Sequence, residues 1–85
     1  MNSKIPEIDV HGFKRLEARD YIYQELIKYR KKKIYTIKVI HGWNNGRVIK
    51  DWLISSESIK KDLNIREIKE DPLNSGATYI FLNIE

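Results

Sequence analysis

Two side chains near the start of the chain have the types and spacing of an acid–base pair. In the segment Ile8-Asp9-Val10-His11 the carboxylate and the imidazole are two residues apart, and the two-residue period of a β-strand places them on the same side. A carboxylate beside a histidine fixes its tautomer, as a general acid or base requires. The structural alternative is that Asp9 accepts backbone N–H groups of a following helix and His11 closes a turn.

A second polar segment, the HGWNNG of residues 41–46, has the composition of a phosphate-binding loop. Glycine and asparagine enter the positive-φ region most readily, which lets backbone N–H groups converge on an anion at a helix N-terminus. Arg47 and Lys50 follow the loop and would add attraction. Asn-Asn-Gly is also ordinary turn chemistry. Trp43 is expected either to stack on a base or to pack on the edge of the sheet.

The charge of the chain points to the same class of partner. It has 16 lysines and arginines against 12 aspartates and glutamates, a net charge of +4 that favours polyanions. The cations are densest from Lys28 to Lys33, where Tyr29 is the only uncharged residue. Such a block either contacts nucleic acid or is a solvated helix end, where the helix dipole favours cations. The absence of cysteine excludes disulfides and thiolate clusters, and two histidines argue against structural zinc.

The hydrophobic pattern predicts an α/β domain with the element order βαβαββ. Apolar residues at helical spacing indicate one helix over about residues 14–30 and a second helix after residue 45. Ser55 and Ser56 are expected to end the second helix and to cap a further turn or two. That helix is expected to bury one face, formed by Val48, Ile49, Trp52 and Leu53.

Strands are predicted where β-branched and aromatic residues dominate. Residues 34–40 are of this kind almost throughout, as expected of a strand covered on both faces. A strand, a crossover helix and a second strand form a right-handed unit with parallel strands. His11 and His41 should therefore lie close together at the carboxyl edge of the sheet, where open α/β sheets bind ligands. The predicted strands are residues 5–10, 34–40, 65–69 and 78–82, with a turn over residues 71–76.

Four segments, in this order and spacing, resemble the pattern of the Smr (small MutS-related) domain family in its stand-alone form. They are residues 8–12, 17–18, 40–42 and 74–78. The resemblance implies a two-layer βαβαββ sandwich with a four-stranded mixed sheet and two helices, similar to the C-terminal domain of a bacterial translation initiation factor. It also implies nucleic-acid binding and, in several members, endonuclease activity in which the Asp-x-His residues are implicated. Carried over by position, the implicated residues are Asp9, His11, His41 and Gly42.

One position departs from the family pattern. The second loop of the family reads His-Gly-x-Gly or Thr-Gly-x-Gly, whereas Asn44 stands here in place of the second glycine. Asparagine enters the left-handed region less freely than glycine. A close approach of the backbone to phosphate is therefore harder at Asn44. This departure is expected to reduce catalysis more than binding.

The resulting hypothesis treats residues 1–85 as a single domain that binds DNA or RNA and hydrolyses phosphodiester bonds. His11 acts as general base or acid, Asp9 orients it, and the loop of residues 41–46 holds the phosphate. Asp9 together with phosphate oxygens could hold Mg²⁺. The alternative is a nucleic-acid-binding module without chemistry, and a protein-interaction domain ranks last because no large apolar patch is evident.

The lack of a signal peptide and of a membrane-length apolar run predicts a cytoplasmic protein without a membrane contact. The sequence leaves the choice of DNA or RNA and the oligomeric state open. The predicted catalytic residues are Asp9, His11 and His41. The residues predicted to contact nucleic acid are Gly12, Gly42, Trp43, Asn44, Asn45, Gly46, Arg47 and Lys50 and, in the basic block, Arg30, Lys31, Lys32 and Lys33.

Overall fold

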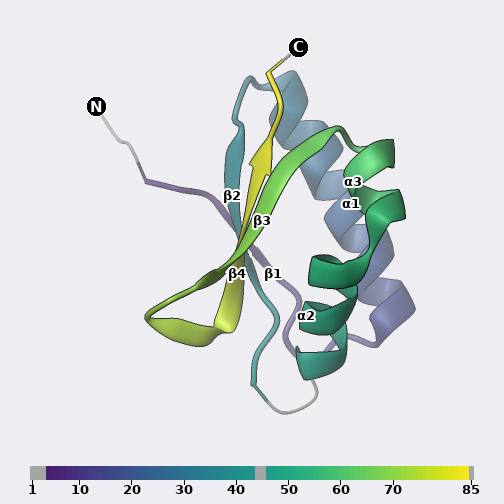
Figure 1. Cartoon of the computed structure of the whole chain (residues 1–85), viewed down its shortest axis with the longest axis vertical. Coiled ribbons are helices and arrows are strands. Elements are labelled where there is room, and N and C mark those ends of the chain that lie inside the picture. Colours follow the sequence, from purple (N-terminus) through teal and green to yellow (C-terminus); the bar gives the residue numbers. More distant parts are fainter. Residues whose placement is uncertain (1–3, 44–45, 85) are drawn as a thin grey trace.

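Four strands form one mixed sheet, and three helices cover one of its faces (Figure 1). The computed structural model describes residues 4–43 and 46–84, and these counts refer to that part of the chain. The strand order is β1-β2-β4-β3, with β1 parallel to β2 and the other neighbours antiparallel. The elements in chain order are β1 Glu7–Asp9, α1 Arg15–Lys31, β2 Thr36–Ile40, α2 Gly46–Ser55, α3 Glu57–Asp62, β3 Ile65–Asp71 and β4 Asn74–Leu82.

The predicted fold class, a two-layer α/β sandwich with a four-stranded mixed sheet, is confirmed. The further turn or two expected after Ser55 and Ser56 is present as α3, which makes three helices in the described residues in place of the expected two. Ser56 separates α3 from α2, because its Oγ accepts the Ile59 N–H at 3.3 Å and so caps a new helix. None of the helices within residues 4–43 and 46–84 is long and apolar enough to cross a membrane.

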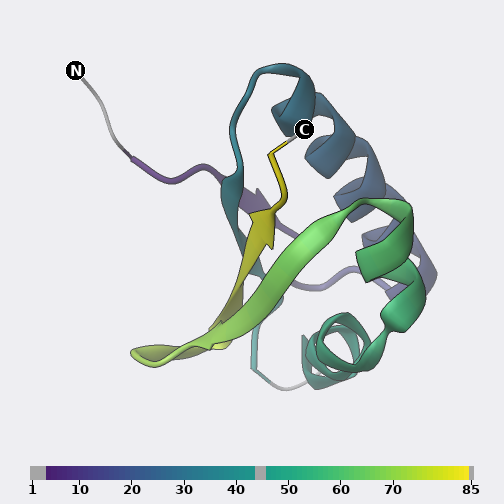
Figure 2. The ribbon, with the colours of Figure 1, turned by 45° about the horizontal axis from the view of Figure 1, so that its top comes forward.

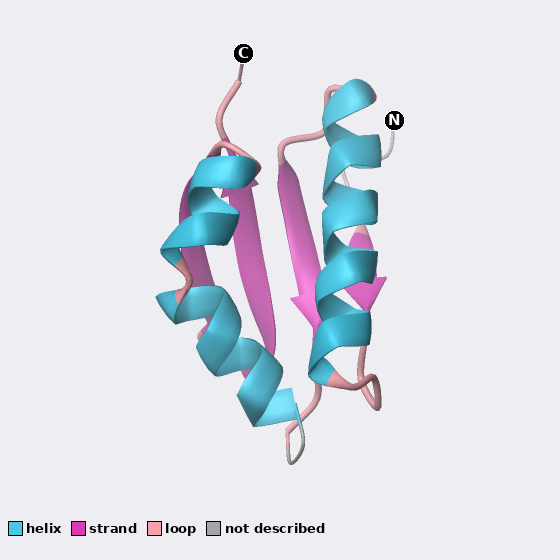
Figure 3. Ribbon diagram, turned by 90° about the vertical axis from the view of Figure 1, so that its right-hand side faces the viewer, coloured by secondary structure: helices cyan, strands magenta, loops and turns pink. Residues whose placement is uncertain are grey.

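The strands β1 and β2 run in the same direction and end at the same edge of the sheet. Their register pairs Asp9 with Ile40, and the Val10 amide donates to the Ile40 carbonyl at 2.8 Å. Figure 3 shows the loop before α1 and the loop before α2 at one end of the molecule. We call this end, which carries residues 11–13 and 41–43, the His-Gly edge.

The core lies between the sheet and the helices. From α1 it takes Ala18, Ile22 and Leu26, which follow the helical period. Burial alternates along β2, since Ile37 and Val39 are buried whereas the residues beside them are half-buried. The expectation that β2 is covered on both faces is therefore wrong. All three helices of the described chain lie on the same side of the sheet (Figure 3).

The helix α2 differs from its predicted buried face at one position. Ile49 and Leu53 are buried, and Trp52 packs half-buried against the core. Val48, in contrast, is 57% exposed. It lies about 100° around the helix from Ile49, on the far side of Trp52, because an α-helix has about 3.6 residues per turn.

The β3–β4 hairpin is tighter than predicted. Asp71 pairs with Asn74, so the turn is shorter than the expected residues 71–76, and Asn74 to Gly76 belong to β4. The register shifts beside Asp71, as in a β-bulge. Figure 2 shows the hairpin extending away from the helices at the lower edge of the sheet. Its return strand thereby brings Gly76 to the His-Gly edge.

Candidate functional site

The end of β1 places Asp9 and His11 in direct contact. The Oδ1 atom of Asp9 lies 2.6 Å from the Nδ1 atom of His11 and accepts the His11 backbone amide at 3.1 Å. The hydrogen bond from the His11 side chain holds the pKa of Asp9 below its usual value, so the carboxylate is ionised at neutral pH. Since an ionised carboxylate only accepts, His11 Nδ1 carries a proton. The predicted pairing of these side chains is confirmed.

The structural alternative for this pair is borne out in part, because His11 and Gly12 do form a turn, in which the Phe13 amide donates to the Val10 carbonyl at 3.0 Å. Asp9 does accept a backbone amide, but the donor is His11 rather than a residue of α1. The start of α1 is served by its own side chain, because the Lys14 amide donates to Glu17 Oε1 at 3.0 Å. The side chains of His11 and Asp9 are 70% and 54% exposed, so a ligand in solution can reach the pair.

Two glycines with positive φ bring the His-Gly pairs together. Gly12 has φ +81° and Gly42 has φ +87°, a left-handed conformation that side chains disfavour. A Cβ on Gly42 would lie 3.4 Å from the Cβ of His11. The predicted proximity of the two pairs at the carboxyl edge is therefore confirmed, and His11 lies beside the second loop.

His41 occupies the interior, not the surface, of this edge. It is 1% exposed, with Nδ1 3.0 Å from the Gly42 carbonyl and Nε2 2.8 Å from Thr78 Oγ1. A carbonyl only accepts, so Nδ1 carries the proton and the Thr78 hydroxyl donates to Nε2. Burial lowers the pKa of His41, which favours the neutral ring. The predicted catalytic place of His41 is corrected, because both ring nitrogens are engaged inside the protein.

The backbone amides at the start of the second loop are also hydrogen-bonded within the protein. The Gly76 carbonyl accepts the amides of His41 and Gly42, each at 3.0 Å. The expectation that the amide of Gly42 converges on an anion is therefore wrong. Asn44 and Asn45 lie outside the described residues, and Gly46 is the first residue of α2.

The start of β4 supports this loop, a role that sequence reasoning missed. Asn74 Oδ1 accepts the Gly76 amide at 2.9 Å and the Trp43 indole N–H at 3.3 Å. Thr78, two residues beyond Gly76, holds the His41 ring. In the sequence, residues 74–78 indicated only the resemblance to the family. Their contacts with His41 and Trp43 could not be predicted, because these residues are more than 30 positions away in the chain.

A cleft of about 460 Å³ opens beside the second loop. Gly42 and Trp43 line it, Arg47 and Lys50 contribute cations from α2, and Asp51 and Glu70 contribute carboxylates. Arg47 is exposed, whereas Lys50 is half-buried and pairs with Glu70 at 2.8 Å. This cleft is the part of the described chain in which the predicted loop and the predicted cations come together.

The basic block lies at the opposite end of the molecule. It comprises the last turn of α1 and the two residues after it, and α1 begins at the His-Gly edge (Figure 3). A helix of 17 residues is about 25 Å long. The block and the cleft are therefore separated by about the length of α1, so only a ligand at least this long could contact both, and contact of the block with nucleic acid stays a prediction. The residues concerned are Arg30, Lys31, Lys32 and Lys33.

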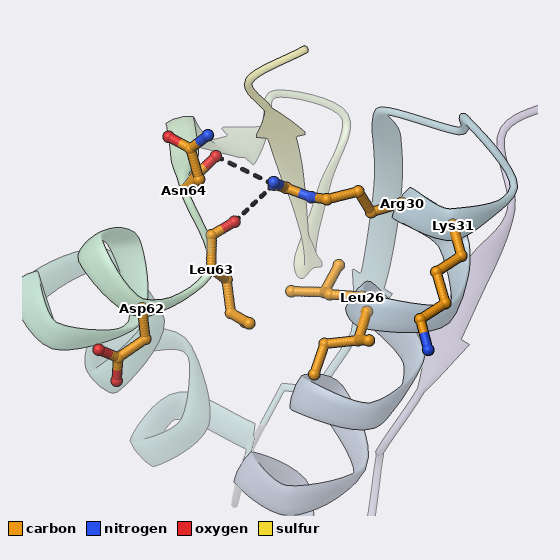
Figure 4. Close-up of a pocket in the computed structure, with 7 residues that line it drawn as sticks. Leu26, Arg30, Lys31, Asp62, Leu63 and Asn64 are labelled. Carbon is orange, nitrogen blue, oxygen red and sulfur yellow. Dashed lines mark hydrogen bonds between the residues drawn. The ribbon is translucent and has the colours of Figure 1, made fainter. Parts of the chain in front are cut away.

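Arg30 has a structural partner at that end. Its guanidinium donates to the backbone carbonyls of Leu63 and Asn64, just after α3 (Figure 4). The Leu63 carbonyl lies at the end of α3, and the Asn64 carbonyl also accepts the Asn83 amide at 3.0 Å, so Arg30 links this segment to α1. Lys28 likewise pairs with Glu25 at 3.0 Å. The solvated-helix-end interpretation of the block accounts for both contacts, while Lys31, Lys32 and Lys33 are exposed.

The described residues contain no group of three or more His, Asp or Glu side chains placed to hold a metal ion. Asp9 offers its carboxylate next to His11. Mg²⁺ is usually held by one or two carboxylates, phosphate oxygens and water. The donor set therefore fits a magnesium ion only together with a bound phosphate.

Comparisons with known proteins agree with this arrangement. The family model of the Smr domain matches residues 8–83. Among solved structures, the chain is similar to the crystal structure of the Smr domain of Thermus thermophilus MutS2, with a TM-score of 0.80 and 22% identity over 93% of this chain and 99% of that chain. None of the curated proteins matches the sequence. At this level of identity the structural likeness establishes the fold.

Proposed function

Because the chain belongs to the Smr domain family, we propose that it binds nucleic acid at its His-Gly edge and hydrolyses phosphodiester bonds there. The observation that carries the proposal is the exposed Asp9–His11 pair beside a cleft that contains two cations. A carboxylate–imidazole pair is suited to proton transfer at neutral pH. Cations in an adjacent cleft are suited to phosphate oxygens.

Binding would depend on the phosphate backbone. Arg47 presents its charge at the start of α2, and Lys50 lines the same cleft. Arg47 is the stronger candidate, because Lys50 is already partly neutralised by Glu70. Contacts of this kind recognise no particular base, so affinity should fall steeply with salt and depend little on sequence.

Chemistry would depend on the second ring nitrogen of His11. With Nδ1 held by Asp9, Nε2 can take the proton from a water molecule or hydroxyl that attacks the phosphorus. The new P–O bond forms as the bond to the leaving oxygen breaks. The leaving oxygen then receives a proton from His11 or from solvent.

One observation favours the alternative of a binding module without chemistry. His41, the second histidine of the chain, is buried, so His11 is the only imidazole that can reach a ligand. The same imidazole would then have to accept the proton of the nucleophile and return it to the leaving oxygen, unless solvent supplies that proton, which limits the rate. This alternative predicts binding at the same cleft with no cleavage.

The experiment is a binding and cleavage assay with labelled single- and double-stranded DNA and RNA, with and without Mg²⁺. The key variant is Arg47→Ala/Lys50→Ala at the cleft. Its matched control is Lys31→Ala/Lys32→Ala, which removes the same charge at the opposite end of α1. We expect the cleft variant to bind more weakly and to show a flatter salt dependence, by roughly one phosphate contact for each cation removed.

The control should lose much less affinity, since its lysines lie away from the cleft. The reverse order, with the larger loss in the Lys31/Lys32 variant, would contradict the proposed location. Binding with no cleavage of any of the four substrates would leave the binding module as the function.

A further inference from the structure

Trp43 is a large aromatic side chain held in place at the surface. Trp43 is 71% exposed, and its indole N–H donates to Asn74 Oδ1 at 3.3 Å. The ring also lies directly on the backbone of Gly76, where an added Cβ would be 2.3 Å from Trp43 Cδ1. The indole can occupy this position only because Gly76 has no side chain.

This position is unlike that of the other tryptophan. Trp52 is half-buried and packs against the core, which accounts for its presence by burial alone. Trp43 is fixed at one edge by Asn74 and Gly76, yet most of its surface remains in water. An aromatic ring that is oriented but uncovered has the properties of a recognition surface.

The surroundings of Trp43 indicate what would cover it. The ring lines the cleft that also contains Arg47 and Lys50. Aromatic rings beside cations bind single-stranded nucleic acid, because bases stack on the ring while the cations contact the phosphates. In a duplex each base is already stacked on its neighbours, so its face is not available to a protein ring.

We propose that Trp43 is a stacking platform for an unpaired base, so that the cleft prefers single-stranded nucleic acid or an unpaired loop over continuous duplex. The proposal rests on the proposed binding of nucleic acid at the His-Gly edge. It adds the substrate class, which charge alone leaves undetermined. It also gives Asn74 and Gly76 a role in positioning, since they hold the ring at the rim of the cleft.

The test compares oligonucleotides that differ only in their bases. The probes are a single strand of about 12 nucleotides, its perfect duplex, and a strand of the same length in which every nucleotide is abasic. All three supply phosphates, but only the first offers unpaired bases throughout. Wild type should bind the intact single strand about 5- to 100-fold more tightly than the abasic strand, the range expected for stacking of a single base.

Trp43→Ala should bind the intact and the abasic strands with equal affinity and should leave duplex binding within about twofold of wild type. Trp43→Phe should retain part of the preference, because a smaller ring still stacks. Gly76→Ala should reduce it, since the new Cβ occupies the place of the indole. In a Trp52→Phe protein, Trp43 is the only tryptophan, and the intact single strand should quench its fluorescence more than the duplex does.

One outcome separates this proposal from the proposed function, and two others refute both. If Trp43→Ala keeps the full preference for intact over abasic strand while Arg47→Ala/Lys50→Ala weakens binding of both, the stacking platform is refuted and nucleic-acid binding at the cleft stands. If wild type binds none of the probes, both proposals are refuted. Quenching of Trp43 by a proline-rich or aromatic peptide, with no effect of any oligonucleotide, would also overturn them in favour of a protein partner.

Discussion

The two His-Gly pairs of the chain share the backbone conformation of their glycines and differ in the surroundings of the imidazole. Both glycines have a positive φ. His11 follows an edge strand and is exposed, with Asp9 as its partner. His41 follows the interior strand β2 and is 1% exposed, held by Thr78 from the neighbouring strand β4. The dipeptide therefore has the same glycine conformation in both places, and the position of the preceding strand in the sheet determines whether the histidine is exposed or buried.

This difference assigns separate roles to the two histidines. His11 is placed for chemistry and contributes little to stability, because both it and its partner face water. His41 contributes to stability and shapes the loop that carries Trp43, since its ring nitrogens connect the loop to β4. Substitutions at the two sites should therefore affect different measurements.

The largest effect on stability is expected from His41→Ala. The substitution removes a buried ring and leaves the Thr78 hydroxyl and the Gly42 carbonyl without their partner, which should lower the free energy of unfolding by about 2–4 kcal/mol. Urea unfolding followed by circular dichroism measures it. The matched change His11→Ala should leave the free energy of unfolding within about 0.5 kcal/mol of wild type. Equal losses of stability at the two positions would contradict the separate roles of the two histidines.

A smaller loss is expected from Thr78→Val, which keeps the shape of the side chain and deletes the hydroxyl. His41 Nε2 then lacks a partner in the interior, at an expected loss of about 1–3 kcal/mol. Thr36→Val, on the half-buried face of β2, is the control and should change the free energy of unfolding little. A Thr78→Val protein as stable as the control would mean that the His41–Thr78 hydrogen bond does not contribute to the free energy of unfolding.

A milder perturbation than either substitution is a change of pH. Burial holds the pKa of His41 below the usual imidazole value of about 6.5. The unfolded chain then binds the proton more readily than the folded protein does, so stability is full above about pH 6.5 and declines as the pH falls toward the lowered pKa. In a His11→Ala protein, His41 is the only histidine, and its NMR titration reports the value directly. Titration at or above 6.5, or stability that rises on acidification across this window, would contradict the buried neutral ring.

The smallest effect on stability is expected from Asp9→Asn. The pair is exposed, so the free energy of unfolding should change by no more than about 0.5 kcal/mol. Cleavage should nevertheless fall by about 100-fold or more, because a neutral amide no longer fixes the tautomer of His11 or stabilises its charged form. An Asp9→Asn protein that is clearly unfolded by the change would show that Asp9 is structural.

The sequence predicted the local and periodic features of the site. The two-residue spacing predicted that Asp9 and His11 meet, although β1 ends at Asp9 and the contact forms in the turn that follows. The parallel crossover predicted that both His-Gly pairs lie at one edge. The burial of His41 could not be predicted in this way, since it depends on Thr78 across the sheet. The structural role of Arg30 could not be predicted either, because the carbonyls to which it donates lie more than 30 residues further along the chain.

The role of Gly76 shows a further limit of the sequence. A glycine before a strand predicts a turn, yet here it belongs to β4 and supplies a surface for Trp43. Such a role depends on a side chain from another loop. Only the assembled edge shows it.

The most direct test of the account is single-turnover cleavage by wild type and by His11→Ala, with affinity measured on the same samples. We expect His11→Ala to bind within about twofold of wild type, because His11 is a proton-transfer group and no cation of the cleft is changed. Its cleavage rate should fall by about 10²- to 10⁴-fold. A His11→Ala protein that cleaves at the wild-type rate would contradict the assignment of the exposed histidine to chemistry.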